Sequence, residues 1–175
     1  MEKFILSVLL CFYIITGMVY AKDEALCDKY VRLHIIANSN TPYDQSVKES
    51  VKTFFLDKHK DKLSDFDLKE KSLQYITENK ETIEVEINEF LKSKGAEYFC
   101  KIEVSKTKYN KNFYESIYLP KGEYDSVKII LGKGNGKNLF FIMFPSQVIK
   151  EDVTVKSSNK DKIIYKSKIA ELLGI

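Results

Sequence analysis

The stretch that decides the fold is residues 118–145, YLPKGEYDSVKIILGKGNGKNLFFIMFP. In its first half Val127, Ile129 and Leu131 fall at every second position, which is typical of a half-buried strand. A glycine-rich loop follows, and residues 139–144 are then an apolar run, long enough for a strand and too short for a helix. Such a run predicts the centre of a sheet, covered on both faces, and Pro145 ends it because proline has no N–H to donate. We therefore expect a hairpin around which the rest of the chain folds.

Composition predicts one domain. The chain has 175 residues, of which 44% are hydrophobic, and this suffices for a single core of ordinary size. Its 28 basic and 25 acidic residues give a net charge of only +3. No basic run alternates with aromatic residues as a nucleic-acid groove requires, so we expect no binding of nucleic acid.

The N-terminus predicts export. Lys3 precedes an apolar run over residues 4–19, and Val19 and Ala21 stand where a signal peptidase reads small or β-branched residues. Residues 1–21 are therefore predicted to be a signal peptide cleaved after Ala21. The alternative is an N-terminal anchor that is kept, because the run is only slightly short of spanning length.

Two cysteines remain after such cleavage, Cys27 and Cys100. Outside the cytoplasm a pair of cysteines favours a disulfide, which here would tie the N-terminal arm to the edge of a strand. The alternative is two unrelated thiols, one exposed and one packed.

The first half of the domain is predicted to be a strand followed by helices. Residues 22–29 form a polar arm, and residues 30–37 alternate as a strand with Arg32 and His34 opposite the apolar face. Thr41, Pro42 and Asp44 predict the start of a helix that fades near residues 58–62.

A second helical region opens at Ser64-Asp65 and ends before Gly95, a residue typical of a helix C-terminus. The apolar pattern lapses near Asn79-Lys80, so we expect one kinked helix or two shorter ones. A coiled coil with a partner is the alternative to a helix laid across the sheet.

Strands are expected again over residues 98–104 and 113–119, separated by a polar connection over 106–112. Residues 146–155 are predicted to be irregular or a short edge strand, and residues 162–173 a strand or an amphipathic helix. The fold class is thus α+β: a single domain over residues 30–150, with a mostly antiparallel sheet and two or three helices packed on one face. Residues 151–175 form a C-terminal extension.

No enzyme motif is complete. The loop from Gly132 to Lys137 has the wrong spacing for a P-loop, lies between strands, and lacks the Ser or Thr that would bind magnesium. Cys27 with His34 is the one exported thiol–imidazole candidate, and nothing positions an oxyanion hole for it. No local Cys or His pair has zinc-ligand spacing. These residues predict a protein that is not an enzyme, with no cofactor and no metal.

Two segments resemble a known family. YVRLHIIANSNTPYDQ over residues 30–45 is similar to the opening R-L-x-x-I-A-N-S-x-x-x-x-D-Q of the stage II sporulation protein R family. LPKGEY over 119–124, IILGKGNGKN over 129–138 and FP at 144–145 resemble the second half of that family, in the same order and spacing. The family typically has two Trp and a Cys after the Asn, and a later second Cys, where this chain has Leu139, Phe140, Phe141 and Val148. Lys137 stands where His is usual, and Cys27 with Cys100 would replace the missing bridge.

The resemblance implies a signal between compartments. Family members are exported into the space between the forespore and mother-cell membranes, where they trigger a membrane-embedded aspartic protease of the mother cell. That protease processes the sigma-E precursor. Contact with a membrane is then expected only through the signal segment or the receptor.

The partner-binding residues are expected among exposed polar groups of the two matched loops, although the same residues could serve as a helix cap and a tight turn. The alternative functions are an exported hydrolase, using Cys27 or an unrecognised pair of carboxylates, and a cell-envelope scaffold or adhesion module. The candidate residues are Arg32, Asn38, Ser39, Asn40, Asp44, Gln45, Gly132, Gly134, Gly136 and Asn138.

Overall fold

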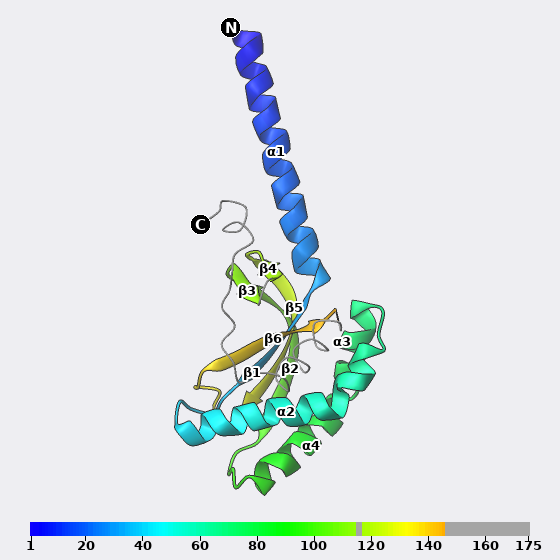
Figure 1. Ribbon diagram of the computed structural model, residues 1–175, viewed down its shortest axis with the longest axis vertical. Coiled ribbons are helices and arrows are strands. Elements are labelled where there is room, and N and C mark those ends of the chain that lie inside the picture. The colour runs from blue at the N-terminus through cyan, green and yellow to red at the C-terminus, as the bar shows by residue number, and fades with distance from the viewer. Residues whose placement is uncertain (115–116, 146–175) are drawn as a thin grey trace, which may run out of the picture.

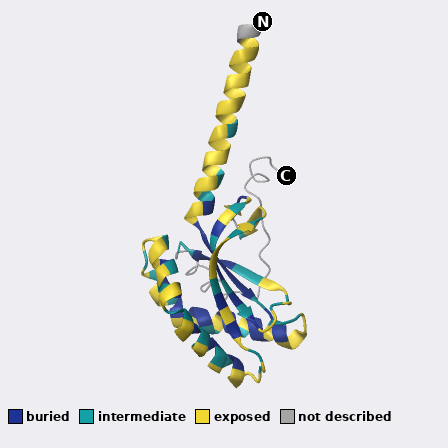
Figure 2. Ribbon diagram, turned by 180° about the vertical axis from the view of Figure 1, so that it is seen from behind, coloured by how far each residue is buried: buried dark blue, intermediate teal, exposed yellow. Residues whose placement is uncertain are grey.

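A long N-terminal helix, α1 (Glu2–Lys29), projects from a layered domain in the computed structural model, which describes residues 1–114 and 117–145 (Figure 1). Its apolar residues are exposed along almost the whole helix (Figure 2). The other elements are β1 (Val31–Ile36), α2 (Pro42–Ser64), α3 (Lys69–Glu78), α4 (Lys80–Ser93), β2 (Cys100–Tyr109), β3 (Asn112–Tyr114), β4 (Ile117–Leu119), β5 (Gly122–Leu131) and β6 (Asn138–Phe144).

The main sheet has four strands in the order β2-β5-β1-β6, and β3 and β4 form a separate two-stranded hairpin. β2 with β5 and β1 with β6 are antiparallel, whereas β1 with β5 is parallel. The helices α2, α3 and α4 lie on one face of this sheet (Figure 1). The predicted α+β class is confirmed, and the sheet is mixed.

The predicted hairpin of the opening stretch is wrong, because β1 lies between β5 and β6 and pairs with both. The apolar run of β6 therefore lies at the edge of the described sheet and not at its centre. It is apolar on both faces because both are covered: Phe141 and Met143 join the core under the helices, and Ile142 joins a second cluster behind the sheet. The predicted polar connection over 106–112 is also wrong at its start, since β2 continues to Tyr109.

Three helix boundaries follow the predictions, but the boundary between the first two helices does not: α2 continues to Ser64, beyond the predicted residues 58–62, and α3 begins at Lys69 and not at Ser64-Asp65. Thr41 Oγ1 accepts a hydrogen bond from the backbone N–H of Asp44 at 3.2 Å and begins α2. The second helical region is two helices, divided at Asn79, whose side-chain amide donates to the carbonyl of Tyr75 at 2.8 Å. Gly95, at a φ of 79°, lets the chain turn out of α4.

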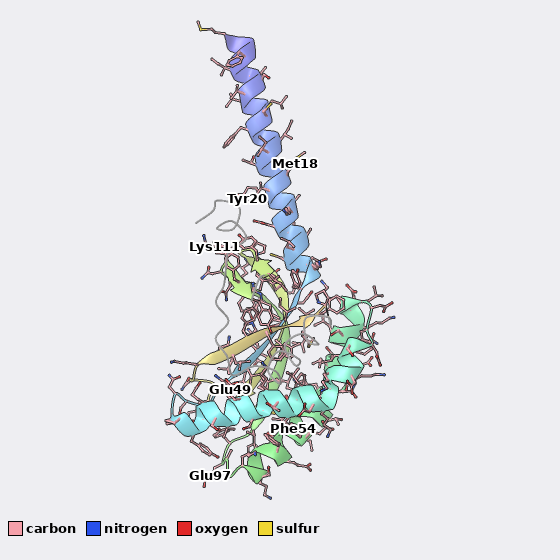
Figure 3. The ribbon with its side chains drawn as sticks, in the orientation of Figure 1. Met18, Tyr20, Glu49, Phe54, Glu97 and Lys111 are labelled. Carbon is pink, nitrogen blue, oxygen red and sulfur yellow. The ribbon has the colours of Figure 1, made fainter. Side chains whose placement is uncertain are left out.

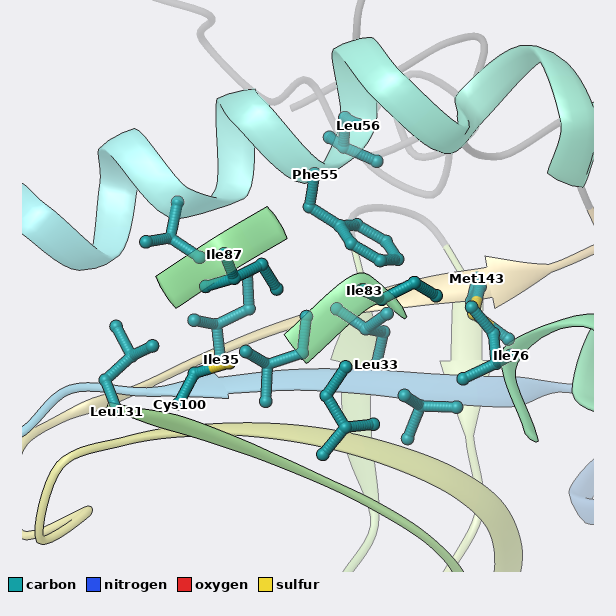
Figure 4. Close-up of a cluster of buried hydrophobic side chains, with 14 of the residues drawn as sticks. Leu33, Ile35, Phe55, Leu56, Ile76, Ile83, Ile87, Cys100, Leu131 and Met143 are labelled. Atoms are coloured by element: carbon teal, nitrogen blue, oxygen red, sulfur yellow. The ribbon is translucent and has the colours of Figure 1, made fainter. Parts of the chain in front are cut away.

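The core lies between the helices and the sheet (Figure 4). Leu33 and Ile35 point from β1 toward Phe55 of α2 and toward Ile83 and Ile87 of α4, and all five are at most 1% exposed. Side chains of this size each contribute about 1.5–3 kcal/mol when fully buried. The alternation of β1 and the apolar stripes of the helices thus build one contiguous core.

The other face of the sheet is closed near α1. A second cluster there contains Cys27, Tyr30, Leu119, Tyr124 and Ile142. The predicted arm over residues 22–29 continues α1 as helix, and Lys69 Nζ lies 2.5 Å from an Asp28 oxygen and 2.8 Å from an Asp125 oxygen. The last turns of α1 are therefore fixed to the domain.

Cys27 and Cys100 are both free and buried, and their predicted disulfide is not formed. Cys27 lies against Gly122, because a Cβ added to that glycine would overlap Cys27 Sγ. Cys100, on β2, lies opposite Leu131 of β5. Gly122 and Leu131 are the two ends of β5, about 30 Å apart for a strand of this length. A disulfide needs Cα atoms within about 7 Å, so this fold excludes the bridge.

The expectations for residues 146–155 and 162–173, and the extension over 151–175, lie outside the described residues. The division of the N-terminus into a signal peptide and an arm stays a prediction. The helix over Phe4–Lys29 is long and apolar enough to cross a membrane, since an 18-residue window within it has a mean hydropathy of 2.3, and its place near the N-terminus suits a signal sequence equally well.

Candidate functional site

The two loops singled out from the sequence meet at one end of the sheet. Because β1 and β5 are parallel, their carboxyl ends lie side by side, and the loop of residues 38–40 reaches the loop of residues 132–137. Asn38 Oδ1 accepts from the N–H of Lys133 at 3.0 Å, and Asn40 Oδ1 accepts from the N–H of Lys137 at 2.8 Å. The N–H of Gly136 donates to the carbonyl of Ala37 at 2.8 Å. We call residues 38–40 and 132–137 the interlocked loops.

Asp44 fastens these loops to the start of α2. Its carboxylate accepts from Ser39 Oγ at 2.5 Å, from Asn38 Nδ2 at 3.0 Å and from the Tyr98 hydroxyl at 2.7 Å. Burial opposes ionisation, but the hydrogen bonds from Ser39, Tyr98 and Asn38 outweigh it and hold the pKa of Asp44 below its ordinary value. The ionised carboxylate therefore stabilises the loop arrangement.

Glycine is needed where the loops touch. Gly132 and Gly134 have φ values of 58° and 63°. A Cβ on Gly132 would overlap Asn38 Oδ1, and one on Gly136 would overlap the carbonyl oxygen of Ser39. These glycines let the two backbones approach each other, so they have a structural role whatever else the loops bind.

Asp44 and Arg32, expected to be exposed, are buried, at 5% and 2% exposure. The Arg32 guanidinium lies 3.8 Å from the ring centroid of Tyr124 and 4.6 Å from that of Tyr109. Its Nε and Nη2 atoms have no hydrogen-bond partner among the described residues. The guanidinium also lies 5.3 Å from the ring centroid of Phe140, so it makes cation–π contact with three aromatic rings.

Asn138 contacts His34, which lies two residues after Arg32 on β1, and is not part of the interlocked loops. Its amide Nδ2 lies 2.6 Å from His34 Nδ1, and the imidazole stacks on Tyr109 at 4.8 Å between ring centroids. Burial lowers the pKa of His34 to about 4; the bond to Asn138 opposes this shift, and the charges of Arg32 and Lys128 add to it. The ring is therefore neutral at pH 7. The ten candidate residues thus form two groups: Arg32 and Asn138 behind the sheet, and the other eight at the interlocked loops.

Sequence reasoning missed Tyr98, Lys48, Tyr109 and Tyr124. Lys48 Nζ lies 2.9 Å from Gln45 Oε1 and 3.5 Å from the carbonyl of Lys137, and thereby links α2 to the interlocked loops. Tyr124 is the last residue of LPKGEY, a stretch that matches the family pattern, and this match could have identified it. Tyr98 and Lys48 lie in segments with no such pattern.

The candidate thiol and imidazole lie far apart along β5. Cys27 contacts Gly122, whereas His34 pairs with Lys128 further along β5. Those two positions lie about 20 Å apart, so the thiol and the imidazole do not form a pair. Over residues 1–114 and 117–145, no three His, Cys, Asp or Glu side chains are placed to hold a metal ion. That the protein is not an enzyme stays a prediction.

The chain is a single α+β domain that follows an N-terminal apolar helix. At one end of its sheet, the side chains of Asn38 and Asn40 accept hydrogen bonds from the backbone of the neighbouring loop. A family model described as Stage II sporulation protein R (spore_II_R) matches residues 27–154, and the chain belongs to this family. Stage II sporulation protein R of Bacillus subtilis (strain 168) is 23% identical, in an alignment that covers 91% of this chain and 81% of that protein. No solved structure matches the chain. The resemblance seen in the sequence is confirmed, and with it a role in sporulation.

A first prediction concerns the close approach at Gly132. Gly132→Ala will lower the free energy of unfolding more than Gly95→Ala, by at least about 1 kcal/mol, because its Cβ overlaps Asn38 Oδ1. Gly95 also has a positive φ, but a Cβ there lies 3.9 Å from the nearest atom, the Tyr43 hydroxyl, so this variant reports the backbone cost alone. Urea unfolding of both variants measures the difference, and equal losses would contradict the contact.

A second prediction concerns His34. An unfolded chain binds a proton at His34 below about pH 6.5, whereas the folded chain does so only below about pH 4. Stability is therefore unaffected by His34 at pH 7 and falls as the pH drops from 6.5 to 4, by up to about 3 kcal/mol. His34→Phe keeps the aromatic stack and will flatten this decline. Melting temperatures between pH 7 and pH 4 test it. The pKa of His59 is also lowered by burial, so His59 will keep part of the decline in the His34→Phe variant. A slope that is unchanged in His34→Phe would contradict the assignment to His34.

Proposed function

We propose that this protein is an exported signal of sporulation, secreted into the space between the forespore and mother-cell membranes. There it activates a membrane-embedded aspartic protease that processes the sigma-E precursor. Membership of the stage II sporulation protein R family carries this proposal. The apolar helix α1 is compatible with export, as this role requires.

The signal acts by binding the active state of the protease more tightly than the inactive state, which shifts the equilibrium between them. Such a signal needs a surface with a fixed shape, because flexible loops would lose entropy on binding. The interlocked loops have that property: hydrogen bonds from Lys133, Gly136 and Lys137 hold one loop against the other. We therefore assign the contact with the protease to their outer surface.

Two lysines are the sharpest probes of this surface. Lys133 and Lys137 are exposed, and each contributes to the loop contact through its backbone N–H. Substitution by alanine keeps this backbone N–H. Their side chains can be removed without breaking the loop contacts. Asn138 is less suitable, because its amide also bonds to His34.

The third prediction is that a Lys133→Ala and Lys137→Ala double variant keeps its melting temperature and loses activation, by about tenfold or more if the pair contributes at least 1.4 kcal/mol. The assay co-expresses the full chain, the cognate protease and the sigma-E precursor in a non-sporulating host and follows the size of the precursor. Lys92→Ala with Lys94→Ala, two exposed lysines at the end of α4, is the matched control.

Each outcome decides something. No cleavage with the unchanged chain, when the protease and the folded chain are both present, overturns the proposed function. Cleavage that the Lys133 and Lys137 variant supports as well as the unchanged chain keeps the function and moves the contact away from the interlocked loops. Equal loss in the control pair would show that total charge, and not this surface, matters.

A further inference from the structure

A cavity of about 1130 Å³ lies where α1 meets the domain. One wall comes from α1 between Tyr20 and Asp28, and the other carries Lys111 and Tyr118 of the segment that forms the β3–β4 hairpin. Figure 3 shows Tyr20 and Lys111 on the same side of α1, close to the place where the helix enters the domain. The hairpin thus stands beside the last turns of the helix.

The apolar part of α1 ends at this level. Residues 4–21 are apolar or uncharged, and they rise about 27 Å along the helix axis, close to the roughly 30 Å of a bilayer's hydrocarbon core. With these residues in a membrane, Tyr20 and Ala21 lie at the boundary between hydrocarbon and headgroups. The α1 wall of the cavity then extends about 12 Å outward from that boundary, through the headgroup layer.

The hairpin carries exposed aromatic side chains at this position. Phe113 is 65% exposed and Tyr118 is 41% exposed. They face each other across the two strands with ring centroids 5.4 Å apart. An aromatic pair can simply stabilise a short hairpin. That explanation accounts for their contact with each other, but not for large apolar surfaces left in water next to an apolar helix.

Lysines line the same cavity as Tyr118. Lys106, Lys108, Lys111 and Lys121 all line the cavity. The acidic side chains of its wall are Asp23, Glu24, Asp28, Glu123 and Asp125. Lys69 bridges Asp28 and Asp125 and balances one of their two charges, so positive and negative charges around the cavity cancel and the lysines lie among carboxylates. Lysines beside exposed aromatic rings suit the headgroup layer, where ammonium groups meet lipid phosphates and aromatic rings lie at the interface.

We propose that Phe113 of β3 and Tyr118 of β4, with Lys111 and Lys121, form a membrane-contacting surface of the chain that keeps α1 uncleaved as an anchor. While α1 spans a phospholipid bilayer, Phe113 and Tyr118 lie in the headgroup layer, and Lys111 and Lys121 contact lipid phosphates. Membrane contact then includes the folded domain and is not limited to the N-terminal helix. The domain is held in a fixed orientation to the bilayer and does not swing freely from α1.

The fourth prediction uses tryptophan fluorescence, since the chain contains no Trp. The full chain carrying Phe113→Trp is reconstituted into phosphatidylcholine and phosphatidylglycerol vesicles, with or without bromine on the lipid chains close to the headgroups. Its emission will shift to shorter wavelength relative to the same chain in detergent, and brominated lipid will quench most of it. Phe99→Trp is the matched control, because Phe99 is 76% exposed and precedes Cys100 at the other end of β2.

The proposal requires quenching at position 113 and none at position 99. Absence of quenching at both positions would place the hairpin in water and overturn it. Equal quenching at both would mean that the domain lies flat on the bilayer or has unfolded, which also contradicts it. Adding Lys111→Gln and Lys121→Gln to Phe113→Trp will reduce the quenching. Unchanged quenching would contradict the contact of these two lysines with lipid phosphates. The measurement needs no protease, so its result is independent of the proposed function.

Discussion

The strand β1 has partners on both sides, β5 in parallel and β6 antiparallel, and the rest of the domain depends on this double pairing. A strand with two neighbours satisfies all its backbone polar groups within the sheet, so it can be buried on both faces. Val31, Arg32, Leu33, His34 and Ile35 are accordingly all buried, although two of them are polar. The helices cover one face, and the aromatic rings around Arg32 and His34 cover the other. A polar residue on this strand therefore indicates the environment behind the sheet and not the solvent.

The same insertion explains the interlocked loops. To run from β5 to β6, the chain must pass over the end of β1, because β1 lies between them. Residues 132–137 make that crossing, and they meet the loop that leaves β1 for α2. Both loops would otherwise leave backbone N–H groups without partners at the end of the sheet, and Asn38 and Asn40 accept two of these bonds. The contact is thus a requirement of the topology, and any function of these residues is added to it.

Local chemistry in the sequence predicted the local structure well. The cap at Thr41, the break at Asn79 and the turn at Gly95 depend on neighbours within a few residues, and each is where the pattern indicated. The predicted pairing of β5 with β6 is wrong. A short glycine-rich loop between two strands normally makes a hairpin, and nothing in residues 118–145 reveals that β1 lies between these two strands. The disulfide between Cys27 and Cys100 failed for the same reason, since their positions at opposite ends of β5 follow only from the register. At the candidate site the residue types were predicted, but the burial of Arg32 and Asp44 was not. It depends on the rings of Tyr109 and Tyr124 around Arg32, and on Tyr98 and the interlocked loops around Asp44.

The two proposed surfaces lie at opposite ends of the domain. β5 begins at Gly122, next to α1 and the hairpin, and ends at Leu131, where the interlocked loops start, about 30 Å away. If the hairpin rests on the membrane that holds α1, the interlocked loops point away from that membrane. A protease embedded in the same bilayer could reach them only with a domain that extends about as far. A protease in a second membrane facing the first would meet them directly, and the fixed orientation of the domain would present the loops to it. If both proposals hold, the length of β5 separates the two surfaces in the way that a signal acting across a gap between two membranes requires.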